Sequence, residues 1–113
     1  MKDLIEQVKH FRRERDWDQY HSPKNLVMAL VVEVSELAEH FQWLTEKQSS
    51  SLPPDKLAEV QEEIGDVLIY LANLCDKLGI DPLAAAHDKL RKNRLKYPAA
   101  KVHGKSDKYT EYK

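Results

Sequence analysis

The chain has 113 residues, of which 42% are hydrophobic and 33% are charged, and its formal net charge is -1. This length suffices for one hydrophobic core and is too short for two ordinary domains. The balanced charge excludes an overall field that would attract nucleic-acid backbones or anionic lipid, so we expect neither nucleic acid nor a membrane as a partner.

The first ten residues, MKDLIEQVKH, are polar, and no run of about 18 apolar residues follows them. We therefore expect no secretory signal, no membrane span and a cytoplasmic location. The single cysteine, Cys75, lies on a helical apolar stripe and cannot close an intrachain disulfide. Its expected role is core packing.

Apolar periodicity predicts a first helix from about Lys2 to Arg13, which the ERDWDQYH stretch ends. Ser22 can cap a second helix, with Pro23 in its first turn. This helix is predicted to extend as far as Phe41. Its predicted apolar sector contains Leu26, Leu30, Val34, Leu37 and Phe41.

A third helix is predicted from about Asp55 to Leu78, after the polar loop TEKQSSSLPP. Gly79 suits the left-handed position that follows a last helical turn. The predicted apolar sector of this helix contains Val60, Ile64, Val67, Leu71 and Leu74.

Asp81 followed by Pro82 predicts the start of a fourth helix, which ends near Lys96. No stretch alternates with period two for long enough to form a strand, so we expect an all-α fold. Short connections between helices favour a four-helix bundle. We predict one helical domain over residues 1–98 and a C-terminal tail over residues 99–113.

Two carboxylates spaced three residues apart occur on each of two helices. These acid pairs are Glu33 with Glu36 on the second helix and Glu63 with Asp66 on the third. Residues three apart project within about 60° of each other, and both pairs border an apolar sector. If the pairs face one another, proton uptake or a divalent metal relieves their repulsion.

The ligand chemistry of these acids favours Mg²⁺, with Mn²⁺ as a tolerated substitute, because the donors are hard oxygens without cysteine or paired histidines. Residues 25–46 contain no lysine or arginine, which is unusual for an ordinary solvated acidic face. Such a face is still the alternative interpretation for either pair taken alone.

Five elements in order resemble a known family: RDWDQYHSPKNL, EVSELAEHFQW, EEIGDVLIYL, NRLKYP and KYTE. Together they resemble the MazG-like all-α nucleoside triphosphate pyrophosphohydrolases, and within these the dCTP pyrophosphatase branch. The hallmark of that family, ExxE followed by ExxD, is matched by Glu33, Glu36, Glu63 and Asp66.

The resemblance implies Mg²⁺-dependent hydrolysis of a nucleoside triphosphate to the monophosphate and pyrophosphate, with these four acids as metal ligands and catalytic residues. The expected substrate is dCTP or a modified dCTP. Alternatives are a non-catalytic helical interaction module and a nucleotide sensor without turnover.

The resemblance also implies an aromatic base site formed by Trp17, Trp43 and Tyr70, and a nucleotide-binding loop over residues 17–21. Lys89 and Asn93 share one side of the fourth helix, where either phosphate contact or a solvated basic face is expected. The substrate-binding residues are predicted to be Trp17, Asp18, Gln19, Tyr20, His21, Asn25, Trp43, Tyr70, Lys89 and Asn93. Val8 stands where dCTP-preferring relatives have a histidine, which leaves the base preference open.

Four apolar residues lie outside the main apolar sectors, namely Met28, Val32, Ile69 and Ala72. A partner chain is expected to cover them. The resemblance implies a homodimer or homotetramer in which a neighbouring subunit completes each site.

Overall fold

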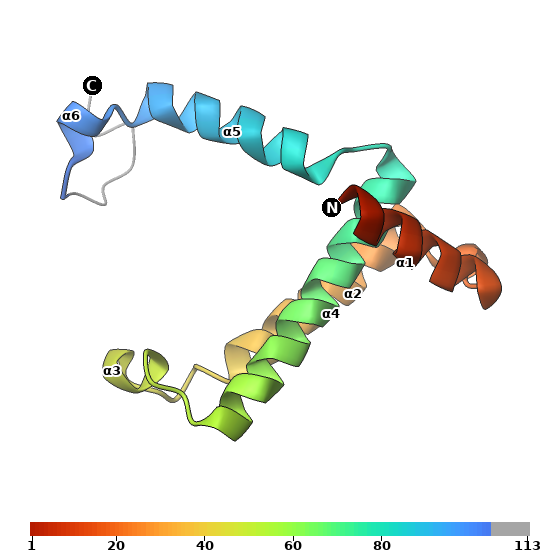
Figure 1. Ribbon diagram of the computed structural model, residues 1–113, viewed down its shortest axis with the longest axis horizontal. Helices are drawn as coiled ribbons and strands as arrows, with labels where there is room; N and C mark the ends of the chain where they lie inside the picture. Colours follow the sequence, from red (N-terminus) through yellow and green to blue (C-terminus); the bar gives the residue numbers. More distant parts are fainter. Residues whose placement is uncertain (105–113) are drawn as a thin grey trace. The chain divides into compact units, whose positions relative to one another are not determined.

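The protein is described here by a computed structural model over residues 1–104, and Figure 1 shows its helices in chain order. No strand occurs within these residues, so the all-α class is confirmed. Of the helices described, none combines the length and the apolar character needed to span a bilayer. The elements are α1 (Lys2–Glu14), the 3₁₀-helix η1 (Asp18–Tyr20), α2 (Pro23–Glu39), α3 (Glu46–Ser49), α4 (Pro54–Leu78), α5 (Pro82–Lys96) and α6 (Ala99–Val102).

Local sequence signals set the ends of the long helices as predicted. The side chain of Ser22 accepts a hydrogen bond from the backbone N–H of Asn25 at 3.2 Å and so caps α2. Gly79 ends α4 with a φ of 66°, in the left-handed region. Asp81 caps α5 by accepting two hydrogen bonds from backbone N–H groups.

Three short features differ from the sequence prediction. α2 ends at Glu39, before Phe41, because the backbone tightens into bonds between residues three apart. The polar loop contains α3, whose Thr45 and Gln48 form a capping box. α6 lies in the predicted tail. The KYTE element, at residues 108–111, lies outside the described residues.

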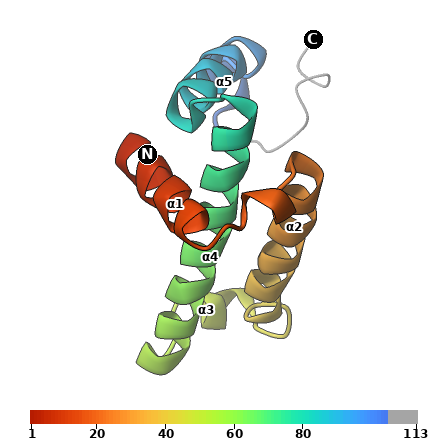
Figure 2. The same cartoon turned by 90° about the vertical axis from the view of Figure 1, so that its right-hand side faces the viewer.

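The chain divides into two compact units, the first of which is Met1–Ile80. In this unit α2 lies beside α4, and α1 crosses the C-terminal half of α4 (Figure 2). The second unit begins at Asp81 and contains α5 and α6. The four-helix bundle, the domain boundary at residue 98 and the homo-oligomer stay predictions.

The core of the first unit consists of a few apolar side chains, of which Leu26 is 1% exposed and Ala72 is fully buried. The burial of Ala72 contradicts its predicted exposure, because α1 packs on α4 and its Arg12 bonds the neighbouring Asn73. Val34 and Ile64 were predicted in the core, yet they are 47% and 52% exposed within the chain. Cys75 is buried, as predicted.

We expect Leu26→Ala to lower the free energy of unfolding by about 3 kcal/mol, because it leaves a cavity between tightly packed helices. Chemical denaturation followed by circular dichroism measures the loss. Leu57→Ala is the matched control, since Leu57 is 53% exposed, and it should cost less than about 1 kcal/mol. Equal losses would show that Leu26 is not in the core.

Candidate active site

Three carboxylates from two helices face each other between α2 and α4. Glu33 and Glu36 come from α2 and Glu63 from α4, and one oxygen of each lies within 4.8 Å of the others. All three side chains are partly buried. We call these residues the acid cluster. The structure thus brings together three of the four predicted metal ligands.

Two oxygens of the acid cluster have no hydrogen-bond partner in the described part of the chain. These are Oε2 of Glu33 and Oε2 of Glu63, and both atoms are buried. A buried polar atom without a partner costs free energy, which a bound cation or a proton offsets. A donor set made only of carboxylate oxygens fits a hard divalent cation such as Mg²⁺ or Mn²⁺.

The electrostatics of the acid cluster favour uptake of positive charge. Burial, with repulsion from Glu36, raises the pKa of Glu33 to about 7. Burial also raises the pKa of Glu63. Protons and divalent cations therefore compete for the same oxygens near neutral pH.

Asp66 stands at the edge of this arrangement. Its side chain is exposed, and its charge contributes to the raised pKa values of Glu33 and Glu63. It also lines a cavity beside the acid cluster. Its role as a fourth metal ligand stays a prediction.

This cavity, of about 410 Å³, lies between α1, the segment 17–21 and α4. Its volume falls within the range of small-molecule sites. Four of its lining residues belong to the predicted site, namely Trp17, His21, Asp66 and Tyr70. The others are Leu4, Gln7, Val8, Phe11, Arg12, Ile69 and Asn73. Apolar walls with a few polar groups suit a flat heteroaromatic ring.

Aromatic rings form one wall of the cavity. The Trp17 ring meets Phe11 edge-on, with centroids 5.8 Å apart, and the His21 ring centroid lies 6.2 Å from that of Trp17. Burial, followed by the charge of Arg12, lowers the pKa of His21, and its Nδ1 is buried without a partner among the described residues. The lowered pKa favours the neutral form of the His21 imidazole.

Four predicted contact residues hold the backbone around the cavity instead of lining it. The Gln19 side chain donates a hydrogen bond to the Asp16 carbonyl at 3.1 Å. Asn25 Nδ2 donates to the carbonyl of Tyr20 at 3.0 Å, and the Tyr20 side chain is exposed. The carboxylate of Asp18 is bound by cationic side chains. Their contacts with substrate stay predictions.

The remaining predicted contacts lie elsewhere in the chain. Trp43 is 87% exposed in the turn that follows α2. Lys89 and Asn93 are on α5, in the second unit. Their roles at the site also stay predictions.

Arg12 and Asn73 line the cavity but were not predicted from the sequence. Both are buried, with exposures of 3% and 4%. Asn73 interrupts the apolar run YLANLC, and a polar residue in such a run is a signal of a buried hydrogen-bonded site.

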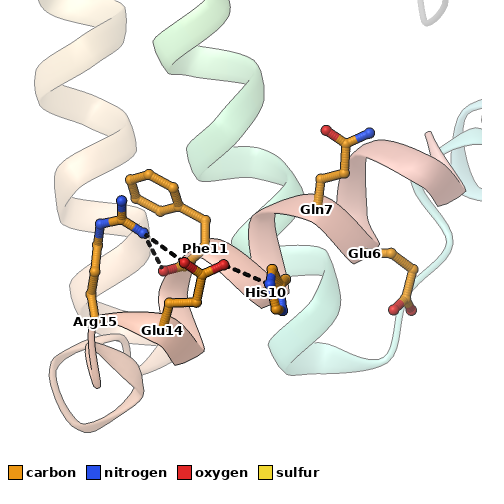
Figure 3. Close-up of a pocket in the computed structure, with 6 residues that line it drawn as sticks. All are labelled: Glu6, Gln7, His10, Phe11, Glu14 and Arg15. Atoms are coloured by element: carbon orange, nitrogen blue, oxygen red, sulfur yellow. Dashed lines mark hydrogen bonds and ion pairs between the residues drawn. The ribbon is translucent and has the colours of Figure 1, made fainter.

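A second hollow, of about 440 Å³, lies on the outer side of α1 (Figure 3). Its lining residues come from α1 and from Arg15, the residue that follows this helix. His10 Nε2 lies 2.6 Å from a carboxylate oxygen of Glu14, and Arg15 donates to the carbonyl of Phe11. We assign no site there.

Comparison with known proteins decides the family. The sequence model of the MazG-like family matches residues 28–112. The chain belongs to the MazG-like family. It is 43% identical to dCTP pyrophosphatase 1 of Mus musculus and of Homo sapiens, over 98% of this chain and 66% of each relative. The chain thus spans 66% of the length of these relatives.

A solved pyrophosphatase chain has the same fold. The crystal structure of a pyrophosphatase from Archaeoglobus fulgidus superposes with a TM-score of 0.82 and 43% sequence identity. The superposition covers 87% of this chain and 92% of that one. The resemblance found in the sequence is therefore confirmed.

The raised pKa of Glu33 predicts a pH-dependent effect of Glu33→Gln in the metal-free protein. The pKa of Glu33 is about 7 in the folded state against 4.5 for an unperturbed glutamate, so the folded state binds more protons between these two pH values. The stability that Glu33 contributes therefore falls as pH rises through this range. Glu33→Gln should raise the Tm near about pH 7.5 and change it less near about pH 5.

Differential scanning calorimetry with a chelator measures this difference, and Glu39→Gln on the exposed side of α2 is the matched control. Mg²⁺ should then raise the Tm of the parent protein more than that of Glu33→Gln. A Tm change from Glu33→Gln that is equal at both pH values would contradict the assignment.

Proposed function

We propose that this MazG-like chain is a Mg²⁺-dependent nucleoside triphosphate pyrophosphohydrolase that cleaves dCTP or a modified dCTP to the monophosphate and pyrophosphate. The observation that carries the proposal is the acid cluster with its two unpaired buried oxygens. The 43% identity to proteins named dCTP pyrophosphatase 1 supports the reaction and the substrate class.

The acid cluster supplies the reaction chemistry in this proposal. Glu33, Glu36 and Glu63 hold the metal, with Asp66 as a further ligand at the cavity edge. Bound Mg²⁺ supplies charge neutralisation and Lewis-acid polarisation for phosphoryl transfer. One glutamate of the cluster accepts the proton of the attacking water.

The neighbouring cavity holds the nucleoside. Trp17 and Tyr70 contribute aromatic surface for the base. Asp66 lines the cavity and also acts electrostatically on the acid cluster, so a nucleoside bound there has its phosphates directed to the acids. Val8 offers no hydrogen bond on its wall, so hydrogen bonds to the base edge come from the polar lining residues, with His21 among them.

We further propose a homodimer or homotetramer. Met28, Val32 and Ile69 are 54%, 54% and 43% exposed, and a partner chain would cover them. A neighbouring subunit then brings residues such as Trp43 to a complete site. The cytoplasmic location and the lack of a nucleic-acid partner stay expectations from the sequence.

A panel of triphosphates tests the reaction and the substrate together. With Mg²⁺ present, dCTP and 5-methyl-dCTP should yield pyrophosphate faster than dUTP, dATP or ATP. Pyrophosphate, and not orthophosphate, should be the first phosphate product. Chromatography that separates the two products measures the outcome. Nucleotide binding without any pyrophosphate would instead indicate a sensor.

Removal of single charges tests the acid cluster. Glu33→Gln and Glu63→Gln should each lower kcat at least about 100-fold, because each deletes a charged ligand from the metal set. Circular dichroism should show an unchanged helical fold. Glu39→Gln is the matched control and should retain kcat within about two-fold. Parent-like rates in both cluster variants would contradict the metal assignment. A protein that shows no turnover, and that binds a basic protein partner through the acid cluster, would also contradict it.

A further inference from the structure

A partly buried charged network joins α1, η1 and α4. Arg12 is only 3% exposed, and its Nε donates to the carboxylate of Asp18. Its Nη1 donates to Asn73 Oδ1 at 2.8 Å, and its Nη2 donates to Asp76 Oδ2 at 2.7 Å. Lys77 Nζ donates to Asp18 at 2.9 Å. These five residues form what we call the Arg12 network.

The chemistry of this network requires arginine. A planar guanidinium presents its N–H groups in fixed directions, and here all three nitrogens of Arg12 are used on different acceptors. A lysine ammonium is one compact charge and cannot reach acceptors so far apart at once. The two cations face two carboxylates, from Asp18 and Asp76, so the charge of the buried Arg12 is balanced.

The network ends on the segment that forms the aromatic wall of the cavity. Asp18 directly follows Trp17, whose backbone N–H donates to the Arg12 carbonyl at 3.0 Å. His21 N–H donates to the carbonyl of Asp18 at 3.2 Å. Both neighbours line the cavity, whereas the Asp18 side chain turns to Arg12 and Lys77. η1 itself buries no side chain, so the ion pairs of Asp18 tie it to α4.

We propose that Arg12 is a positioning residue for nucleotide binding, which holds Asp18 against α4 and thereby fixes Trp17 and His21 in the cavity wall. The inference rests on the proposed function, because it concerns the same cavity. Arg12 acts through Asp18 and not on the reacting phosphates, since its three nitrogens are already engaged. Loss of the network should therefore change substrate affinity and leave the chemical step intact.

Steady-state kinetics of Arg12→Lys, Asp18→Asn and the double variant test this role. Each single variant should raise KM for dCTP at least about five-fold and keep kcat within about two-fold. The KM increase of the double variant should be smaller than the product of the two single increases, because both single variants lose the shared Arg12–Asp18 ion pair. Arg13→Lys, an exposed neighbour on α1, is the matched control and should keep the parent KM. Thermal melting verifies that Asp18→Asn is folded.

A second readout does not depend on turnover. The sequence has two tryptophans, so Trp43→Phe leaves Trp17 as the sole fluorophore. In that background, Asp18→Asn should increase quenching of Trp17 by acrylamide about two-fold, because the wall segment loosens. An α,β-imido analogue of dCTP should bind Asp18→Asn more weakly than the parent by a factor that matches the change in KM.

Several results would overturn the inference: parent-like KM and quenching in Asp18→Asn, a fall in kcat at constant KM, or KM increases that multiply in the double variant. The last result would indicate that Asp18 contacts the substrate directly. If the parent hydrolyses no triphosphate, the proposed function fails by itself. Quenching and binding of the analogue then still decide whether the network positions Trp17.

Discussion

The repulsion among three carboxylates packed between α2 and α4 is the constraint on which the rest of the structure depends. Side chains at such a helix interface are ordinarily apolar, yet Glu33, Glu36 and Glu63 are partly buried there, while Val34 and Ile64 are exposed. Apolar packing at this interface is therefore reduced. Two buried carboxylate oxygens, from Glu33 and Glu63, have no hydrogen-bond partner among the described residues. Such a local conflict with stability is expected at a functional site.

The acid cluster and the aromatic wall of the cavity are held in place by different interactions. The acid cluster projects from two long helices whose packing fixes its spacing, which suits a metal centre that needs constant geometry. The aromatic wall comes from a short segment around η1, and the Arg12 network fastens that segment to the same helix, α4. α4 thus connects the proposed nucleotide cavity with the acid cluster.

Features set by neighbours in sequence were predictable, and features set by distant contacts were not. Ser22, Gly79 and Asp81 mark helix ends through backbone hydrogen bonds or φ preferences, and the spacing of the acid pairs follows from helix geometry. All three residues of the acid cluster were predicted, and Asp66, the fourth predicted ligand, lies outside the cluster and lines the cavity. The Arg12 network joins residues more than 60 positions apart, so no local pattern predicts it. The burial of Ala72 likewise depends on where α1 packs.

The most direct test of the central claim is anomalous X-ray scattering from crystals of the protein grown with Mn²⁺ as a substitute for Mg²⁺. We expect an anomalous peak between α2 and α4, within bonding distance of oxygens from Glu33, Glu36 and Glu63. A map with no peak at the acid cluster, or with Mn²⁺ bound only at other residues, would contradict it.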